Sequence, residues 1–212
     1  MKYYFRNALY LLLAIGLSCA KAGAYDDFFA AINRDDDWGV ARLLERGFDP
    51  NSRDPKGQTG LILALRDDSP RVAAALWKSP ALDVNVQNAS GETALMMAAL
   101  RGQMVWMQRL LDRGAQVHKE GWSPIHYAAT GPEVKAVALL LERGAPVEAS
   151  SPDKDTPLMM AARYGAEGSV ELLLARGASA AAKNGRNLDA VDLARAGGRD
   201  FLVERLQKSV KR

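Results

Sequence analysis

The segment Asp155-Thr-Pro-Leu-Met-Met-Ala161 decides the fold of this 212-residue chain, because related segments recur along it. The second residue of each copy follows that of the previous copy at intervals of 34, 30, 33 and 33 residues. Self-similarity at a nearly fixed period indicates a stacked array of structural repeats. The copies are Gln58-Thr-Gly-Leu-Ile-Leu-Ala64, Glu92-Thr-Ala-Leu-Met-Met-Ala98, Trp122-Ser-Pro-Ile-His-Tyr-Ala128 and the weaker Leu188-Asp-Ala-Val-Asp-Leu-Ala194.

Pairs of large apolar residues form a second signature, in phase with the first. Each pair falls near the end of an expected second helix, and in most repeats a glycine follows that suits a left-handed helix cap. The Thr, Ser or Asp that opens each first helix is a good N-cap residue, and Pro124 and Pro157 stand at the first helical position. Each repeat is therefore predicted to be a pair of helices. The apolar pairs are Leu43-Leu44, Leu76-Trp77, Leu110-Leu111, Leu140-Leu141 and Leu173-Leu174, and the glycines are Gly47, Gly114, Gly144 and Gly177.

These motifs resemble the ankyrin repeat, which has a period of about 33 residues and the hallmark T-P-L-H-x-A. The resemblance implies an all-α solenoid of about six helix-turn-helix repeats joined by short β-finger connectors. The first and last repeats are degenerate and polar, as the ends of a finite array require. The expected repeats span about 25–56, 57–90, 91–120, 121–153, 154–186 and 187–212.

Three departures from the repeat carry their own expectations. The 30-residue interval indicates a shortened finger between Gly114 and Gly121, just before Trp122. Lys154 stands where other repeats have glycine, so that turn is expected to take another form. The run Asp35 to Asp37 is expected to form a solvated face on the first repeat.

The first 24 residues read as a secretory signal peptide. Lys2 and Arg6 precede the uncharged, mostly apolar run 8–17, and small residues follow. Cleavage is expected after Ala24 or Ala22, and the preferred cut after Ala24 would leave residues 25–212 as a periplasmic or secreted domain. Two alternatives remain open: an uncleaved membrane anchor, and a lipoprotein scaffold tethered through Cys19.

Charge and cysteine content exclude several classes of partner and chemistry. The signal holds three basic residues and no acidic one, so the remaining chain has 25 of each sign. A neutral domain implies neither a nucleic-acid nor a membrane partner, unless the signal is retained or Cys19 is lipidated. Because Cys19 is the only cysteine, the mature domain has no disulfide or thiolate chemistry. We expect it to be monomeric.

The resemblance implies that a protein partner binds the concave face of the first helices and the finger tips. Trp122 is the principal candidate, since Trp, Tyr and Arg are enriched in binding hot spots. Its alternative role is to fold over the shortened finger and fill space there. Finger residues such as Asn88 are further candidates. The partner-binding set is Trp122, Arg101, Leu100, Arg163, Tyr164, Arg66, Glu92, Thr130 and Lys119.

No catalytic motif is present, so no catalytic residue, cofactor or metal site is expected, and the chain is interpreted as a non-enzyme. His126 takes the hallmark histidine position, which implies a structural tie between neighbouring loops. The pairs Met96-Met97 and Met159-Met160 leave open copper handling, although methionine commonly fills cores. The leading interpretation is an exported protein that binds one partner as a scaffold or accessory to another exported protein.

Overall fold

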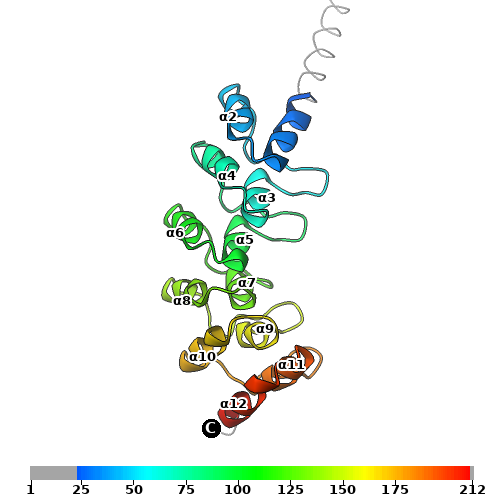
Figure 1. The fold of residues 1–212 in the computed structure, drawn as a ribbon, viewed down its shortest axis with the longest axis vertical. Coiled ribbons are helices and arrows are strands. Elements are labelled where there is room, and N and C mark those ends of the chain that lie inside the picture. The colour runs from blue at the N-terminus through cyan, green and yellow to red at the C-terminus, as the bar shows by residue number, and fades with distance from the viewer. Residues whose placement is uncertain (1–22, 211–212) are drawn as a thin grey trace, which may run out of the picture. The chain divides into compact units, whose positions relative to one another are not determined.

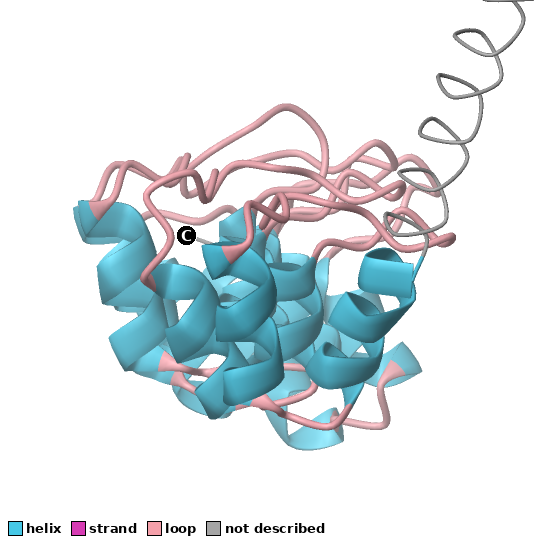
Figure 2. Cartoon of the chain, turned by 90° about the horizontal axis from the view of Figure 1, so that it is seen from above, coloured by secondary structure: helices cyan, strands magenta, loops and turns pink. Residues whose placement is uncertain are grey.

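The computed structural model describes residues 23–210, and the expected signal segment lies almost entirely outside them. Helices and loops make up this part of the chain, and no strand is drawn in it (Figure 2). Six helix pairs follow one another in residues 23–210, as the repeat phase predicts. Two compact units divide the chain at Asp83 and Val84, and each is described by itself.

The first unit contains two helix pairs. Residues 23–33 are helical and are followed by α2 (Asp37–Glu45), α3 (Gly60–Arg66) and α4 (Pro70–Trp77). Helix α4 packs against both α2 and α3. The fully buried core includes Phe28, whose ring lies 4.5 Å from that of Phe48.

The acidic run at the start of the first unit is not merely solvated, which corrects the prediction for Asp35 to Asp37. Asp36 accepts the N–H of Gly39 at 3.0 Å and so caps α2. Asp35 accepts the N–H of Val72, in the first turn of α4, at 2.8 Å. Both carboxylates satisfy backbone donors that a helix start leaves free, and Asp35 also ties the two helix pairs together.

The second unit stacks four helix pairs in two rows. Figure 1 shows the first helices α5 (Ala94–Arg101), α7 (Pro124–Thr130) and α9 (Pro157–Arg163) following one another. The second helices α6 (Met104–Asp112), α8 (Val134–Glu142) and α10 (Glu167–Ala175) form a row beside them. The unit ends with α11 (Ala190–Ala196), which packs on α9, and α12 (Asp200–Val210).

Alanine allows the first helices to pack closely. Ala98, Ala99, Ala128 and Ala129 are fully buried, and the equivalent pair in α9 is buried too. Leucine or isoleucine three residues earlier fills the space between adjacent helices. The expected apolar face is therefore confirmed, and it explains why a repeat needs neighbours to bury its surface.

Most finger tips share one turn, built on an Asp, Asn or Ser. Asn88 is buried, its backbone N–H bonds to Glu92 O at 2.9 Å, and its side-chain oxygen accepts from the N–H groups of Ser90 and Glu92. The same backbone bond joins Ser151 to Asp155 O at 3.0 Å. Asn88 is thus a structural residue of the turn, not an exposed contact.

The prediction for Lys154 is wrong. Its φ is 62°, in the left-handed region, where Gly57, Gly91 and Gly121 each have 75°. The N–H of Lys154 donates to Ser151 O at 2.9 Å, so the turn keeps the form of the glycine-containing fingers. Backbone hydrogen bonding sets this conformation, and the lysine adopts it at a conformational cost.

The finger before Trp122 differs from the others, in line with its shorter sequence. Elsewhere, the carbonyl just before the helix N-cap accepts a backbone N–H from across the finger, as Glu92 O does. Here the corresponding carbonyl, Trp122 O, accepts from Lys119 Nζ at 3.3 Å. A side chain therefore supplies the donor at this position.

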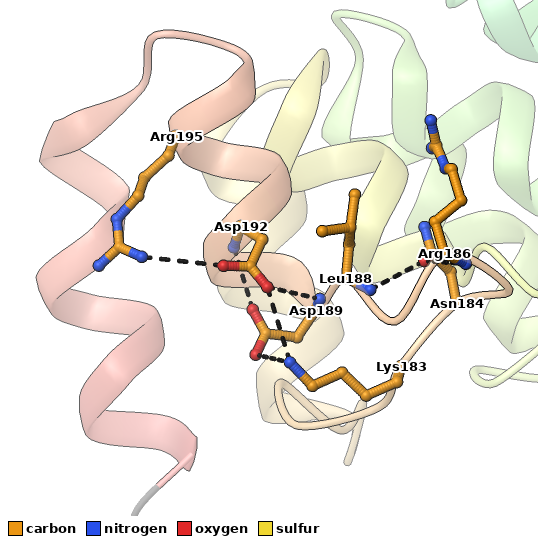
Figure 3. A network of polar contacts seen from close by, with 7 residues as sticks. All are labelled: Lys183, Asn184, Arg186, Leu188, Asp189, Asp192 and Arg195. Atoms are coloured by element: carbon orange, nitrogen blue, oxygen red, sulfur yellow. Dashed lines mark hydrogen bonds and ion pairs between the residues drawn. The ribbon is translucent and has the colours of Figure 1, made fainter.

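The last repeat carries a polar cluster (Figure 3). Lys183 Nζ lies 2.7 Å from Asp189 Oδ2 and 3.6 Å from Asp192 Oδ2, and Arg195 approaches Asp192 at 3.8 Å. Asp189 caps α11 by accepting the N–H of Asp192. Asp192 takes the hallmark histidine position, so this repeat presents a carboxylate where the internal repeats have Ile62, Met96, His126 and Met159.

Candidate functional site

A groove opens across α5, α7 and α9, and we call it the Trp122 groove. Its volume is about 250 Å³, and almost all of its lining surface is apolar. Tyr127 and Met160 occupy the variable x position of the hallmark, one turn before Thr130 and Arg163 in their own helices. The lining residues are Leu100, Trp122, His126, Tyr127, Thr130 and Met160.

Aromatic contacts set the position of Trp122. Its half-buried ring meets the His126 ring edge-on, with centroids 5.4 Å apart, and the Tyr127 ring at 6.5 Å. Trp122 therefore has a packing role, and its role in partner binding stays a prediction. Its ring packs on α7 and also lines the groove, while its carbonyl accepts from the shortened finger.

His126, a lining residue of the groove, holds α7 to the next finger through hydrogen bonds. The side chain is fully buried, and its Nε2 lies 3.0 Å from Ala149 O and 3.2 Å from Asp155 O, both in the next finger. Its Nδ1 accepts the N–H of Ser123 at 3.2 Å. Burial lowers the pKa of His126 below its ordinary value of 6.5, and the bonds to the two carbonyls offset this only in part. The predicted structural tie is present.

Glu92 lies behind the lining residue Tyr127 and accepts two hydrogen bonds. Tyr127 donates its hydroxyl to Glu92 Oε1 at 2.8 Å, and Asn88 Nδ2 donates to Oε2 at 2.6 Å. Desolvation and the adjacent carboxylate raise the pKa of Tyr127, which keeps the phenol protonated as the donor. Glu92 is therefore a structural carboxylate at the finger edge of the groove.

The structure brings some of the predicted binding residues together and separates others. Leu100, Trp122 and Thr130 line the groove, and Thr130 also donates its hydroxyl to His126 O. Lys119 is half-buried, with its ammonium on the Trp122 carbonyl. Arg66 belongs to the first unit, where its guanidinium makes a two-pronged ion pair with Asp67.

Arg101, Arg163 and Tyr164 lie at the ends of the helices that line the groove. Arg101 directly follows Leu100 and is exposed, and Arg163 follows Met160 by one turn. The Arg163 guanidinium lies 4.9 Å from the centre of the Tyr164 ring, which is 54% exposed. Repeat alignment placed these residues correctly on the helix ends, but it gave no signal for Tyr127 and Met160 beyond their shared variable position.

Neither a metal-binding cluster nor a membrane span is found in the described part of the chain. Residues 23–210 contain no group of three or more His, Cys, Asp or Glu side chains arranged to hold a metal ion. Met96, Met97 and Met159 are buried among the first helices, where they serve packing. No helix in these residues is long and apolar enough to cross a membrane.

Stacked helix pairs with a groove across the first helices are typical of helical repeat proteins that bind other molecules through this surface. The family model for ankyrin repeats matches residues 28–119, 73–151 and 106–184. The chain belongs to the ankyrin-repeat family, whose repeats generally mediate interactions between proteins.

Curated relatives share the repeats within much longer chains. The mouse B-cell lymphoma 3 protein homolog is 34% identical over 155 residues, covering 70% of this chain and 35% of its own length. Human SH3 and multiple ankyrin repeat domains protein 2 is 35% identical over 151 residues, covering 68% of this chain and 8% of its own length. This chain thus spans about a third or less of these relatives, and the likeness concerns the repeats.

Proposed function

We propose that this chain is an exported accessory or scaffold protein that binds one partner protein through the Trp122 groove. The observation that carries the proposal is the groove itself: about 250 Å³ of nearly apolar surface across three first helices. A buried hydrogen bond holds His126 and a half-buried one holds Tyr127, so the surface is already formed before a partner arrives. Apolar grooves with a few fixed polar groups are typical binding sites.

The proposed address rests on the sequence of the first 24 residues. A basic start, a short apolar run and small residues at 22 and 24 support export with cleavage. The test is the intact mass of the C-terminally tagged protein recovered from the periplasm of a Gram-negative host. A mature start at Gly23 or Tyr25 supports the proposal, and retention of Met1 contradicts it. A lipidated Cys19 would make the protein a tethered scaffold.

Binding is tested by quantitative pull-down with the tagged full chain from the organism that makes it. The Trp122→Ala/Arg101→Ala double variant is expected to lose most of the recovered partner, because truncating a central aromatic and an arginine removes typical hot-spot contacts. Arg176→Ala is the matched control, since Arg176 is exposed at the C-terminal end of α10, outside the groove lining. Undiminished recovery of every partner by a folded double variant would exclude the groove.

A further inference from the structure

Two arginines flank the Trp122 groove at the C-terminal ends of its outer helices. Arg101 is the last residue of α5, directly after the lining residue Leu100. Arg163 is the last residue of α9, and the lining residue Met160 lies three positions before it on the same helical face. An occupant of the groove would therefore meet a guanidinium at each of these helix ends.

Neither guanidinium is neutralised within the described part of the chain. Among residues 23–210, Arg101 makes no ion pair or side-chain hydrogen bond, and the Arg163 guanidinium stacks on the Tyr164 ring at 4.9 Å. Glu133, whose side chain lies against Gly102, accepts the N–H of Lys135, and Glu167, four positions after Arg163, pairs with Arg205 at 2.8 Å. Arg66, paired with Asp67, shows how a helix-end arginine is neutralised elsewhere in this chain.

The opposite edge of the groove has the other charge. Glu92 lies at the finger edge, with its two oxygens held by Tyr127 and Asn88. A segment that crosses the groove would therefore find a carboxylate at the fingers and two cations at the helix ends. The apolar space between them is large enough for one bulky side chain and gives it aromatic edges and a thioether to contact.

We propose that the groove binds an acidic segment of the partner protein: one large apolar side chain enters the groove, and carboxylates beside it pair with Arg101 and Arg163. This inference rests on the proposed function and adds the chemistry of the partner. Arginine suits the task because its planar guanidinium accepts a carboxylate through two parallel hydrogen bonds. Since both arginines reach solvent, salt weakens this preference.

The experiment measures fluorescence anisotropy of short labelled peptides titrated with the full chain. All peptides share one length, and a central Phe is flanked by Asp and Glu, by Lys, or by Ser; a fourth keeps the acidic flanks around Ala. We expect the acidic Phe peptide to bind about tenfold more tightly than the Lys peptide, with the Ser peptide between them. Replacement of Phe by Ala should abolish measurable binding.

Charge reversal at the two arginines gives the decisive comparison. Arg101→Glu/Arg163→Glu should invert the preference toward the Lys peptide, while Arg176→Glu, the matched reversal outside the groove lining, should leave it unchanged. Equal binding of all three Phe peptides would overturn the acidic preference. Absence of binding by the acidic Phe peptide would overturn it too.

The two proposals can fail separately. If the parent chain binds the three Phe peptides equally and Trp122→Ala weakens the binding of each, the groove still binds protein segments and only the acidic preference falls. If the pull-down is insensitive to Trp122→Ala/Arg101→Ala, the proposed function itself falls, whatever the peptides show.

Discussion

The hydroxyl of Tyr127 lies 2.8 Å from the carboxylate of Glu92, a residue 35 positions earlier in the chain. This bond joins the middle of one first helix to the start of the preceding one. It holds the side chain of Tyr127, which lines the Trp122 groove. The shape of the groove therefore depends on a contact between repeats.

Tyr127→Phe should lower the free energy of unfolding by about 1–2 kcal/mol, because a half-buried carboxylate loses one of its two donors. Urea denaturation followed by circular dichroism measures the change. Tyr164→Phe is the control, since Tyr164 is 54% exposed, and it should stay within about 0.5 kcal/mol of the parent. Equal changes in the free energy of unfolding would show that the Tyr127 hydrogen bond does not stabilise the fold.

Lys154→Gly should stabilise the protein by about 1 kcal/mol. The backbone at Lys154 has a φ of 62°, which glycine adopts without the steric cost that a side chain brings. Thermal unfolding gives the shift. Asp153→Gly, at the neighbouring exposed position, should be neutral or destabilising, because it adds backbone freedom to the unfolded chain without relieving strain.

Stability should fall as the pH drops below about 6.5. His126 has a lowered pKa in the folded state, so in this range the unfolded chain binds the additional proton. The stabilisation is fully present above the unfolded pKa and is lost progressively toward the folded one. Urea midpoints at a series of pH values between about 5 and 8 measure the loss.

His126→Gln is the comparison variant for this pH dependence. It removes the titrating group, so its midpoint should vary less with pH than that of the parent. An identical slope in both proteins would assign the pH dependence to other groups.

Ser169→Ala should stabilise the protein by about 1 kcal/mol. The Ser169 hydroxyl is fully buried in α10 and has no hydrogen-bond partner among the described residues, so its desolvation is uncompensated. Ser179→Ala at an exposed loop position is the matched control and should have little effect. A destabilised Ser169→Ala variant would mean that the hydroxyl is satisfied in solution.

Much of the fold was predictable because it depends on short-range patterns. Thr93, Thr156 and Asp189 cap their helices as expected, and the alanine faces are buried. Thr59 holds the N-cap position without a side-chain capping bond, so residue type fixed the helix start there but not the contact. The prediction for Asp35 and Asp37 was wrong because their partners, Val72 and Arg71, lie on another helix.

The candidate site was predictable only in outline. Repeat alignment placed Trp122, Leu100 and Thr130 on one face, and the structure brings them into one groove. Tyr127 and Met160 were missed because the x position carries no fixed residue type in the repeat.

The sequence by itself determined the repeat phase, the helix pairs and the family, because N-caps, apolar periodicity and glycine caps act within a few residues of each other. Only the tertiary structure decided which charges are neutralised. Arg66 pairs with its neighbour Asp67, whereas the acidic residues near Arg101 and Arg163 are engaged by other groups. The left-handed turn at Lys154 and the Tyr127–Glu92 bond were likewise set by hydrogen bonds that close only once finger and helices have folded and stacked. Such choices depend on which side chains and backbone groups meet in space, and spacing along the chain does not specify that.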